Sequence, residues 1–167
     1  MKQNTERTKY IIGQSSLGLI LLTAEQCGIN GISLGDREAD LINQLNPSWQ
    51  KLPSDPQLQD YLCQIAAYCE QPTTNLSLPI VMHGSLFQQQ VWQAIRAIPS
   101  GTTVSYRQLA NAIGKPQAVR AVANACAANR LALVIPCHRV VRSDGAISGY
   151  RWGAERKAEL LKRERQS

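Results

Sequence analysis

The hydrophobic and polar pattern of the first half of the chain predicts a mixture of strands and helices. Strand candidates are residues 9–12, 17–23, 28–34 and 77–82, and the third of these begins with turn residues that lead into alternating apolar positions. Helices are expected at residues 36–45, closed by Asn46-Pro47, and at residues 57–70, which follow Pro56 and stop at Pro72. We expect residues 1–83 to form an α/β domain that acts as a scaffold.

The pattern becomes helical after His83-Gly84, where we place a domain boundary. Helices are predicted at residues 87–98, from Ser105 to residue 113, and from the turn Gly114-Lys115-Pro116 to residue 129. A short helix, a glycine turn and a second helix are typical of a helix-turn-helix. We therefore expect residues 84–167 to form a mainly helical domain that binds DNA and carries the active site.

The third predicted helix of this domain has two different faces. Val119, Val122 and Cys126 form an apolar stripe, whereas the outward face carries Arg120, Ala121, Asn124 and Ala127. Small side chains around one arginine allow close approach to DNA with little demand on base sequence, as in the minor groove. The alternative is an alanine-rich helix selected for helix propensity alone.

Composition indicates the size of the core and the redox compartment. The chain has 167 residues, 44% of them hydrophobic, which suffices for one domain or two small ones. The five cysteines form no Cys-x-x-Cys pair and two histidines are too few for an obvious zinc set, so we expect reduced thiols and no metal. The polar start and the lack of a long apolar run predict a soluble, cytoplasmic protein without a membrane partner.

Charge is distributed unevenly between the two halves. Residues 1–83 hold 5 basic and 8 acidic residues, a net charge of −3, whereas residues 84–167 hold 13 and 4, a net charge of +9. Residues 71–143 contain no acidic residue at all. A polyanion is the natural partner for such a surface, although a basic face that only confers solubility remains the alternative.

The segment Pro136-Cys137-His138-Arg139-Val140 is the candidate reactive motif. Thiolate is the reactive form of cysteine, and a neighbouring imidazole and guanidinium are expected to raise the thiolate fraction. The preceding apolar run, residues 131–135, is predicted to be a strand that Pro136 stops, which places Cys137 at a strand-to-loop junction. From these five residues alone, a buried structural cysteine is an equal alternative.

Five further motifs occur in a fixed order: Phe87-Gln88-Gln89-Gln90-Val91-Trp92, Val104-Ser105-Tyr106, Arg120-Ala121-Val122, the segment from Ile135 to Val141, and Gly149-Tyr150-Arg151-Trp152-Gly153. In these motifs the chain resembles the O6-alkylguanine-DNA alkyltransferases, and within them the C-terminal domain of bacterial Ada proteins. The resemblance covers nearly the whole chain. It implies a ribonuclease-H-like α/β domain followed by a winged-helix-like domain with a helix-turn-helix.

The same resemblance implies a function in DNA repair. An alkyl group, above all methyl, would pass from O6-alkylguanine in double-stranded DNA to a cysteine, directly, irreversibly and once per molecule, after the nucleotide is flipped out. O4-alkylthymine is a further candidate substrate. The resemblance implies no cofactor, and we expect a bacterial monomer.

Family resemblance also implies roles for single residues. Cys137 resembles the alkyl acceptor, His138 the base that acts through a water, and Glu164 the carboxylate that orients the base. Asn129 resembles the asparagine that holds the turn beside the active-site loop. Tyr106 resembles the tyrosine that rotates the target phosphate and donates a proton to the guanine.

Arg120 resembles the arginine that replaces the extruded nucleotide in the base stack, which fits the need for a wedge in any reaction at O6. The expected pocket residues are Pro136, Val140, Tyr150, Arg151 and Trp152. Human-type members have small residues after the pocket tyrosine, so the large pair Arg151-Trp152 predicts a tighter pocket that favours methyl over benzyl. The cysteine and histidine set of the eukaryotic structural zinc site is not recognisable.

Three other functions fit parts of the sequence. A protein that flags lesions without repairing them would lack the cysteine that this chain retains as Cys137. A Cys-His-Glu hydrolase would need an oxyanion hole and a solvent path for deacylation. A winged-helix regulator without chemistry is also conceivable, although its recognition helix would have few side chains to specify bases.

Overall fold

A four-stranded sheet forms the first part of the computed structural model, which describes residues 7–73 and 75–166. The strands are β1 (Lys9–Ser15), β2 (Gly18–Glu25), β3 (Gly28–Gly35) and β4 (Gln50–Lys51), in the order β3-β2-β1-β4. The first three are antiparallel neighbours, and the short β4 runs parallel to β1. The three strands predicted in residues 9–34 are thus confirmed.

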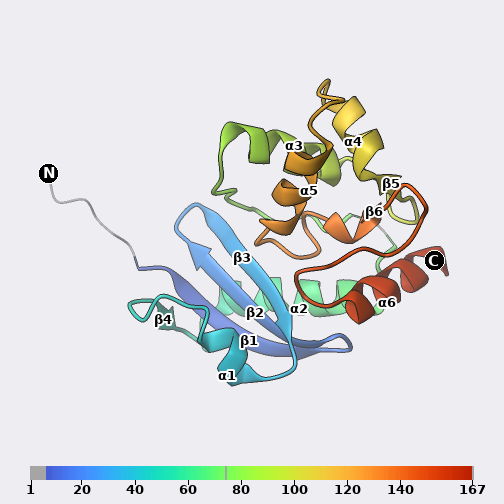
Figure 1. Cartoon of the computed structure of the whole chain (residues 1–167). Helices are drawn as coiled ribbons and strands as arrows, with labels where there is room; N and C mark the ends of the chain where they lie inside the picture. The colour runs from blue at the N-terminus through green and yellow to red at the C-terminus, as the bar shows by residue number, and fades with distance from the viewer. Residues whose placement is uncertain (1–6, 74, 167) are drawn as a thin grey trace, which may run out of the picture.

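Two helices complete this part: α1 (Glu38–Ile42) beside β3, and α2 (Pro56–Glu70) behind β1 and β2 (Figure 1). The start of α2 follows from its sequence, because the Asp55 carboxylate accepts hydrogen bonds from the backbone N–H groups of Gln57 and Leu58 and Pro56 opens the first turn. Its buried side chains, among them Ile65, face the sheet and join the hydrophobic core.

The second part is mainly helical and lies on the other side of the molecule (Figure 1). Its elements are α3 (Leu86–Arg96), β5 (Val104–Ser105), α4 (Tyr106–Ala112), α5 (Val119–Ala127), the 3₁₀ turn η1 (Cys137–Arg139), β6 (Val140–Val141) and α6 (Ala154–Arg165). Ser85 and Ser105 form capping boxes that fix the starts of α3 and α4. Gly114, with φ of 72°, makes the turn after α4, which confirms the predicted helix, turn and helix.

The prediction of a strand at residues 131–135 is wrong. Only Leu131 forms a bridge, with Ile32 of β3, and the rest is a tight turn in which Leu133 has φ of 72°. The Asn129 side chain holds the turn, because its Oδ1 accepts from the Leu131 N–H at 2.8 Å and its Nδ2 donates to the Ile135 carbonyl at 3.0 Å. The run is apolar because all five residues are buried, and burial alone does not specify a strand.

Several other expected elements are shorter than predicted. Residues 77–82 contribute only the bridge between Ile80 and Ile29 of β3. The helix expected at residues 36–45 covers only Glu38–Ile42, α3 ends at Arg96 rather than at residue 98, and α5 ends at Ala127 rather than at residue 129. Through Ile80 and Leu131, segments outside the sheet pair with the exposed edge of β3.

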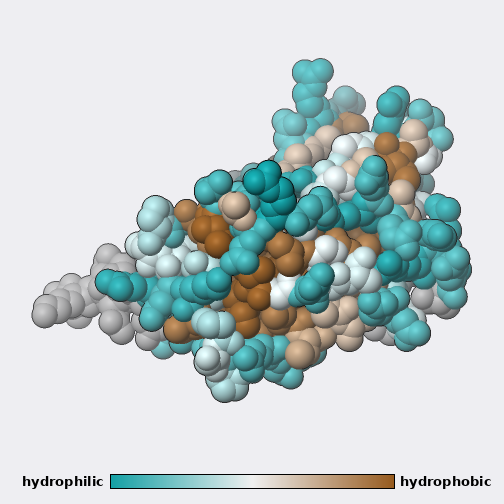
Figure 2. Space-filling view, turned by 90° about the horizontal axis from the view of Figure 1, so that it is seen from below, coloured by the Kyte–Doolittle hydropathy of each residue, from teal (hydrophilic) through white to brown (hydrophobic). Residues whose placement is uncertain are grey.

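The two parts share one hydrophobic core, which includes Ile20 and Ile32 of the sheet and Val122 and Leu160 of the helices. Seen from below, the surface has a hydrophobic band across its middle and is hydrophilic at the end that carries α6 (Figure 2). Among the described helices none is both long and apolar enough to cross a membrane.

Candidate active site

The exposed face of α5 carries the residues that sequence analysis assigned to DNA. Arg120, Ala121, Asn124 and Ala127 are all exposed, whereas Val122 and Cys126 are buried. The predicted division into a packed face and an outward face is therefore confirmed. Within the described part of the chain the Arg120 guanidinium has no hydrogen bond or ion pair, so this long cation is available to an external anion or base stack.

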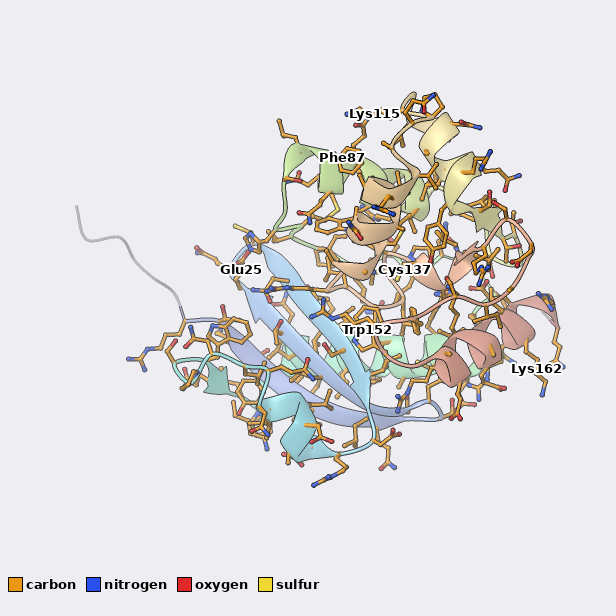
Figure 3. The ribbon with its side chains drawn as sticks, in the orientation of Figure 1. Glu25, Phe87, Lys115, Cys137, Trp152 and Lys162 are labelled. Carbon is orange, nitrogen blue, oxygen red and sulfur yellow. The ribbon has the colours of Figure 1, made fainter. Side chains whose placement is uncertain are left out.

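Cys137 lies in the interior of the molecule, below α5 (Figure 3), and is only 6% exposed. It is the first residue of η1, and its backbone N–H donates to the Ile135 carbonyl at 2.7 Å. The Asn129 amide donates to the Cys137 Sγ at 3.2 Å, so the residue that closes the preceding turn also holds the thiol. This places Asn129 against the reactive atom rather than only beside the loop.

Burial raises the pKa of Cys137, and the hydrogen bond from Asn129 with the charges of Lys157 and Arg151 opposes this only in part. The expected activation by adjacent basic residues is therefore wrong for this structure. Arg139 points to Glu164, and Arg142 is exposed and pairs with Asp144 at 3.5 Å. The thiol consequently needs a base at the moment of reaction.

His138 is fully buried and has one ring nitrogen available for that task. Its Nε2 lies 2.7 Å from the Glu164 Oε1, whereas no described residue forms a hydrogen bond with the buried Nδ1. A carboxylate accepts hydrogen bonds only, so Nε2 carries the proton and the lone pair of a neutral imidazole lies on Nδ1. Burial lowers the pKa of His138, and the hydrogen bond that His138 donates to Glu164 only partly compensates, which favours this neutral form.

Glu164 is shared between His138 and Arg139. The guanidinium Nη2 donates to the Glu164 Oε1 at 2.8 Å, and Nε donates to both carboxylate oxygens at 3.0 and 3.2 Å. Burial alone would raise the pKa of Glu164, but the hydrogen bonds from His138 and Arg139 and the positive charge of Arg139 lower it to about 2. The carboxylate is therefore ionised and fixed in orientation.

Arg139 also reaches the first part of the chain, a contact that sequence analysis missed. Its Nη1 donates to the Asn75 Oδ1 at 2.5 Å and to the Ile98 carbonyl at 2.6 Å, and its Nη2 donates to the Tyr68 hydroxyl at 3.1 Å. None of these three partners is close to Arg139 in sequence, so no local pattern indicates the contacts. The N-terminal part thus supports the carboxylate that orients His138.

Tyr106 is the first residue of α4. Its hydroxyl lies 2.6 Å from the Ser148 hydroxyl, and the Lys157 Nζ donates to the Ser148 Oγ at 3.3 Å and to the Val140 carbonyl at 2.6 Å. Burial raises the pKa of Tyr106. Sequence analysis identified Tyr106 but neither Ser148 nor Lys157.

The expected pocket residues surround Cys137 unequally. Pro136 and Val140 are buried beside it, and the Tyr150 ring makes edge contacts with the rings of His138 at 6.5 Å and Trp152 at 5.2 Å. Trp152 is buried whereas Arg151 is exposed. Residues of the sheet and of the helical part line a cavity of about 430 Å³, and the lining includes Asn129 and Arg151 but not Cys137.

Two family models match successive parts of the chain. The model described as "6-O-methylguanine DNA methyltransferase, ribonuclease-like domain" matches residues 8–82, and that of the "DNA binding domain" of the same protein matches residues 86–166. A Methanosarcina barkeri methylated-DNA--protein-cysteine methyltransferase is 34% identical, over 93% of this chain and 96% of its own length. The chain belongs to the 6-O-methylguanine DNA methyltransferase family.

Other relatives of this chain agree in sequence and in fold. The Escherichia coli "Bifunctional transcriptional activator/DNA repair enzyme Ada" is 54% identical over 93% of the chain, and the chain spans 45% of its length, about half. The crystal structure of Mycobacterium tuberculosis OGT in complex with DNA has a TM-score of 0.83 at 30% identity and covers 95% of this chain and 93% of its own.

Metal ligands are not gathered in the described part of this chain. No group of three or more His, Cys, Asp or Glu side chains there could hold a metal ion. The absence of a structural zinc stays a prediction, which elemental analysis can test.

Proposed function

We propose that this chain repairs DNA by moving the alkyl group of O6-alkylguanine onto the Cys137 Sγ, once per molecule. The observation that carries the proposal is a buried thiol held by Asn129 next to a His138–Glu164 pair, inside a member of this family. An S–C bond forms, the bond between the alkyl carbon and O6 breaks, and guanine, the leaving group, stays in the DNA in its unmodified form. A thioether has no easy return to the thiol, so each molecule reacts once.

His138 acts as the base in this proposal. The free lone pair of Nδ1 accepts the thiol proton through one water, while Nε2 holds its proton against Glu164. The positive imidazolium that forms is stabilised by the ionised Glu164, whose position Arg139 fixes. In this proposal the thiol proton therefore passes through a water to the imidazole, which the carboxylate holds in place.

The DNA surface in this proposal is the exposed face of α5. Its alanines allow the backbone of double-stranded DNA to approach through the minor groove, and Arg120 fills the space of the flipped nucleotide. In this proposal Tyr106, the first residue of α4, donates a proton to the departing base. Opening the site is required, because Cys137 has little exposure in this structure.

Finer features of the fold and assembly belong to the same proposal. We assign residues 1–83 to a ribonuclease-H-like domain and residues 84–167 to a winged-helix-like domain, the boundary following His83. Pro136, Val140, Tyr150, Arg151 and Trp152 are proposed to line a pocket that favours methyl over benzyl. We expect a monomer that needs no cofactor, and O4-alkylthymine is the second substrate to test.

The direct test is to incubate the protein with duplex DNA that contains O6-methylguanine and to measure the mass of the intact protein. We expect a gain of one methyl group, mapped to the peptide of Cys137 and abolished in Cys137→Ala. Cys126→Ala is the matched control, since Cys126 is also buried near the site and should leave transfer intact.

Other outcomes distinguish the remaining functions. Binding to lesion-containing DNA without a mass gain would indicate a protein that flags lesions. Repeated turnover of an ester or amide would indicate a hydrolase, and either result would overturn single-use alkyl transfer.

A further inference from the structure

Ser148 joins two functional groups that approach the site from different elements. It lies in the loop between β6 and α6, and its hydroxyl contacts the Tyr106 hydroxyl of α4 at 2.6 Å and the Lys157 Nζ of α6 at 3.3 Å. A hydroxyl can accept one proton and donate another at the same time. The three side chains therefore form a continuous hydrogen-bonded chain from the interior to the tyrosine.

Lys157 is an unusual end for such a chain. It is 1% exposed, and its only hydrogen-bond acceptors among the described residues are the neutral Val140 carbonyl at 2.6 Å and the Ser148 hydroxyl. No described carboxylate pairs with it, although buried ammonium groups usually need a counter-ion. Its proton is consequently easier to release than that of an exposed lysine, and burial lowers the pKa of Lys157 accordingly.

We propose that Ser148 is a positioning residue that passes a proton from Lys157 to Tyr106 as guanine leaves. This inference rests on the proposed alkyl transfer. When the C–O6 bond breaks, its electron pair stays with guanine, which takes the Tyr106 proton. Tyr106 takes the proton of Ser148, and Ser148 takes one from the Lys157 ammonium, while the thiol proton goes to His138. Protons and charges balance, and water later restores Lys157 and His138.

The structure gives Ser148 this role rather than a direct contact between the two ends. The Lys157 Nζ already donates a hydrogen bond to the Val140 carbonyl at 2.6 Å, which fixes the position of the ammonium group. The Tyr106 hydroxyl has Ser148 as its only described hydrogen-bond partner. Removing the serine hydroxyl would therefore leave Tyr106 without a proton source and without an orienting contact.

The test compares Ser148→Val with Ser148→Thr, which have the same shape but differ in the hydroxyl. A positioned proton donor contributes about 100- to 10,000-fold to a rate, and we expect Ser148→Val to lose about 10- to 100-fold of methyl transfer from duplex DNA. Ser148→Thr should stay within about threefold of the wild type by the same reasoning. Equal rates for the two variants would overturn the inference.

Two further measurements separate proton supply from a merely structural role. In a Tyr106→Phe background, Ser148→Val should cause no additional loss of transfer rate, because the tyrosine hydroxyl that would pass the proton to guanine is already absent. Methylation of Cys137 by methyl iodide, followed by peptide mass, should be unaffected by Ser148→Val, since iodide leaves without a proton. Additive losses, or an equal loss with methyl iodide, would show that Ser148 acts through loop structure.

The same series keeps this inference distinct from the proposed function. If the wild-type protein gains no methyl group from O6-methylguanine DNA, alkyl transfer itself fails. If the wild type reacts and Ser148→Val reacts as fast, only the role of Ser148 fails.

Discussion

Replacing Arg139 by methionine should destabilise the protein strongly, although the residue has no proposed contact with DNA. The substitution keeps an apolar stem but removes the guanidinium that holds Glu164 and that donates to Asn75, Tyr68 and the Ile98 carbonyl. Both members of the Arg139–Glu164 pair have fully buried side chains.

The expected loss can be worked out in two ways. Removing one partner of a buried ion pair costs about 3–5 kcal/mol, because the other charge stays buried without compensation. The fall of the Glu164 pKa from 4.5 to about 2 corresponds to about 3 kcal/mol at about 1.4 kcal/mol per tenfold change, and His138 and Arg139 supply this together. Arg139 accounts for only part of the second figure, so we expect a loss of about 3 kcal/mol, a large part of the roughly 5–15 kcal/mol typical of a domain.

Urea unfolding at pH 7 measures this loss, with Arg142→Met as the matched control. Arg142 is 63% exposed and pairs with Asp144 at 3.5 Å, so its replacement should cost less than about 1 kcal/mol. The double variant Arg139→Met/Glu164→Gln should be more stable than Arg139→Met, since it removes the uncompensated carboxylate. A loss for Arg139→Met no larger than that of Arg142→Met would refute the reasoning.

The ion pair also predicts the acid sensitivity of the fold. Because folding lowers the pKa of Glu164 from 4.5, its stabilising contribution is complete above that pH and disappears as the pH falls towards 2. The stability of Arg139→Met should depend less on pH over this range than that of the wild type.

Three further predictions concern the reaction. Arg120→Ala should slow repair of duplex DNA by about tenfold or more, because a specific DNA contact is worth about 1–3 kcal/mol. The reaction with the free base O6-methylguanine should keep its rate. Equal slowing of both reactions would exclude a wedge role. Asn129→Ala should slow methyl transfer and raise the pKa of Cys137 further, because the hydrogen bond that favours its thiolate is lost. The pKa can be measured from the pH dependence of thiol alkylation, followed by mass spectrometry. The rate of transfer should fall in acid with an inflection below pH 6.5, since burial lowers the pKa of His138, and an inflection above that value would contradict a neutral imidazole base.

The sequence predicted the elements whose ends are set by local chemistry. Asp55 with Pro56, and Ser105 with its capping box, fix helix starts that can be read from a few residues. The run at residues 131–135 was misassigned because a buried turn and a buried strand are both continuously apolar. The helix α6 was not predicted at all: its sequence is mostly charged, and its apolar stripe is short.

Local sequence likewise identifies some of the functional residues and not others. Cys137, His138 and Arg120 stand in recognisable motifs, whereas Ser148, Lys157 and the contacts of Arg139 with Tyr68 arise only when distant segments meet. Local sequence has no signal for such pairs, since each residue alone is ordinary.

The docking of residues 80 and 131 on β3 has a consequence for solubility. An unpaired edge strand is a template for addition of strands from other molecules, and here one edge of the sheet is occupied by these bridges while the other ends in the two-residue β4. The segment at residue 131 of the helical part therefore helps to protect the sheet against aggregation. A fragment that ended at residue 83 would keep the bridge of Ile80 to Ile29 but lose that of Leu131 to Ile32, so the part of β3 around Ile32 would be exposed and the fragment should self-associate.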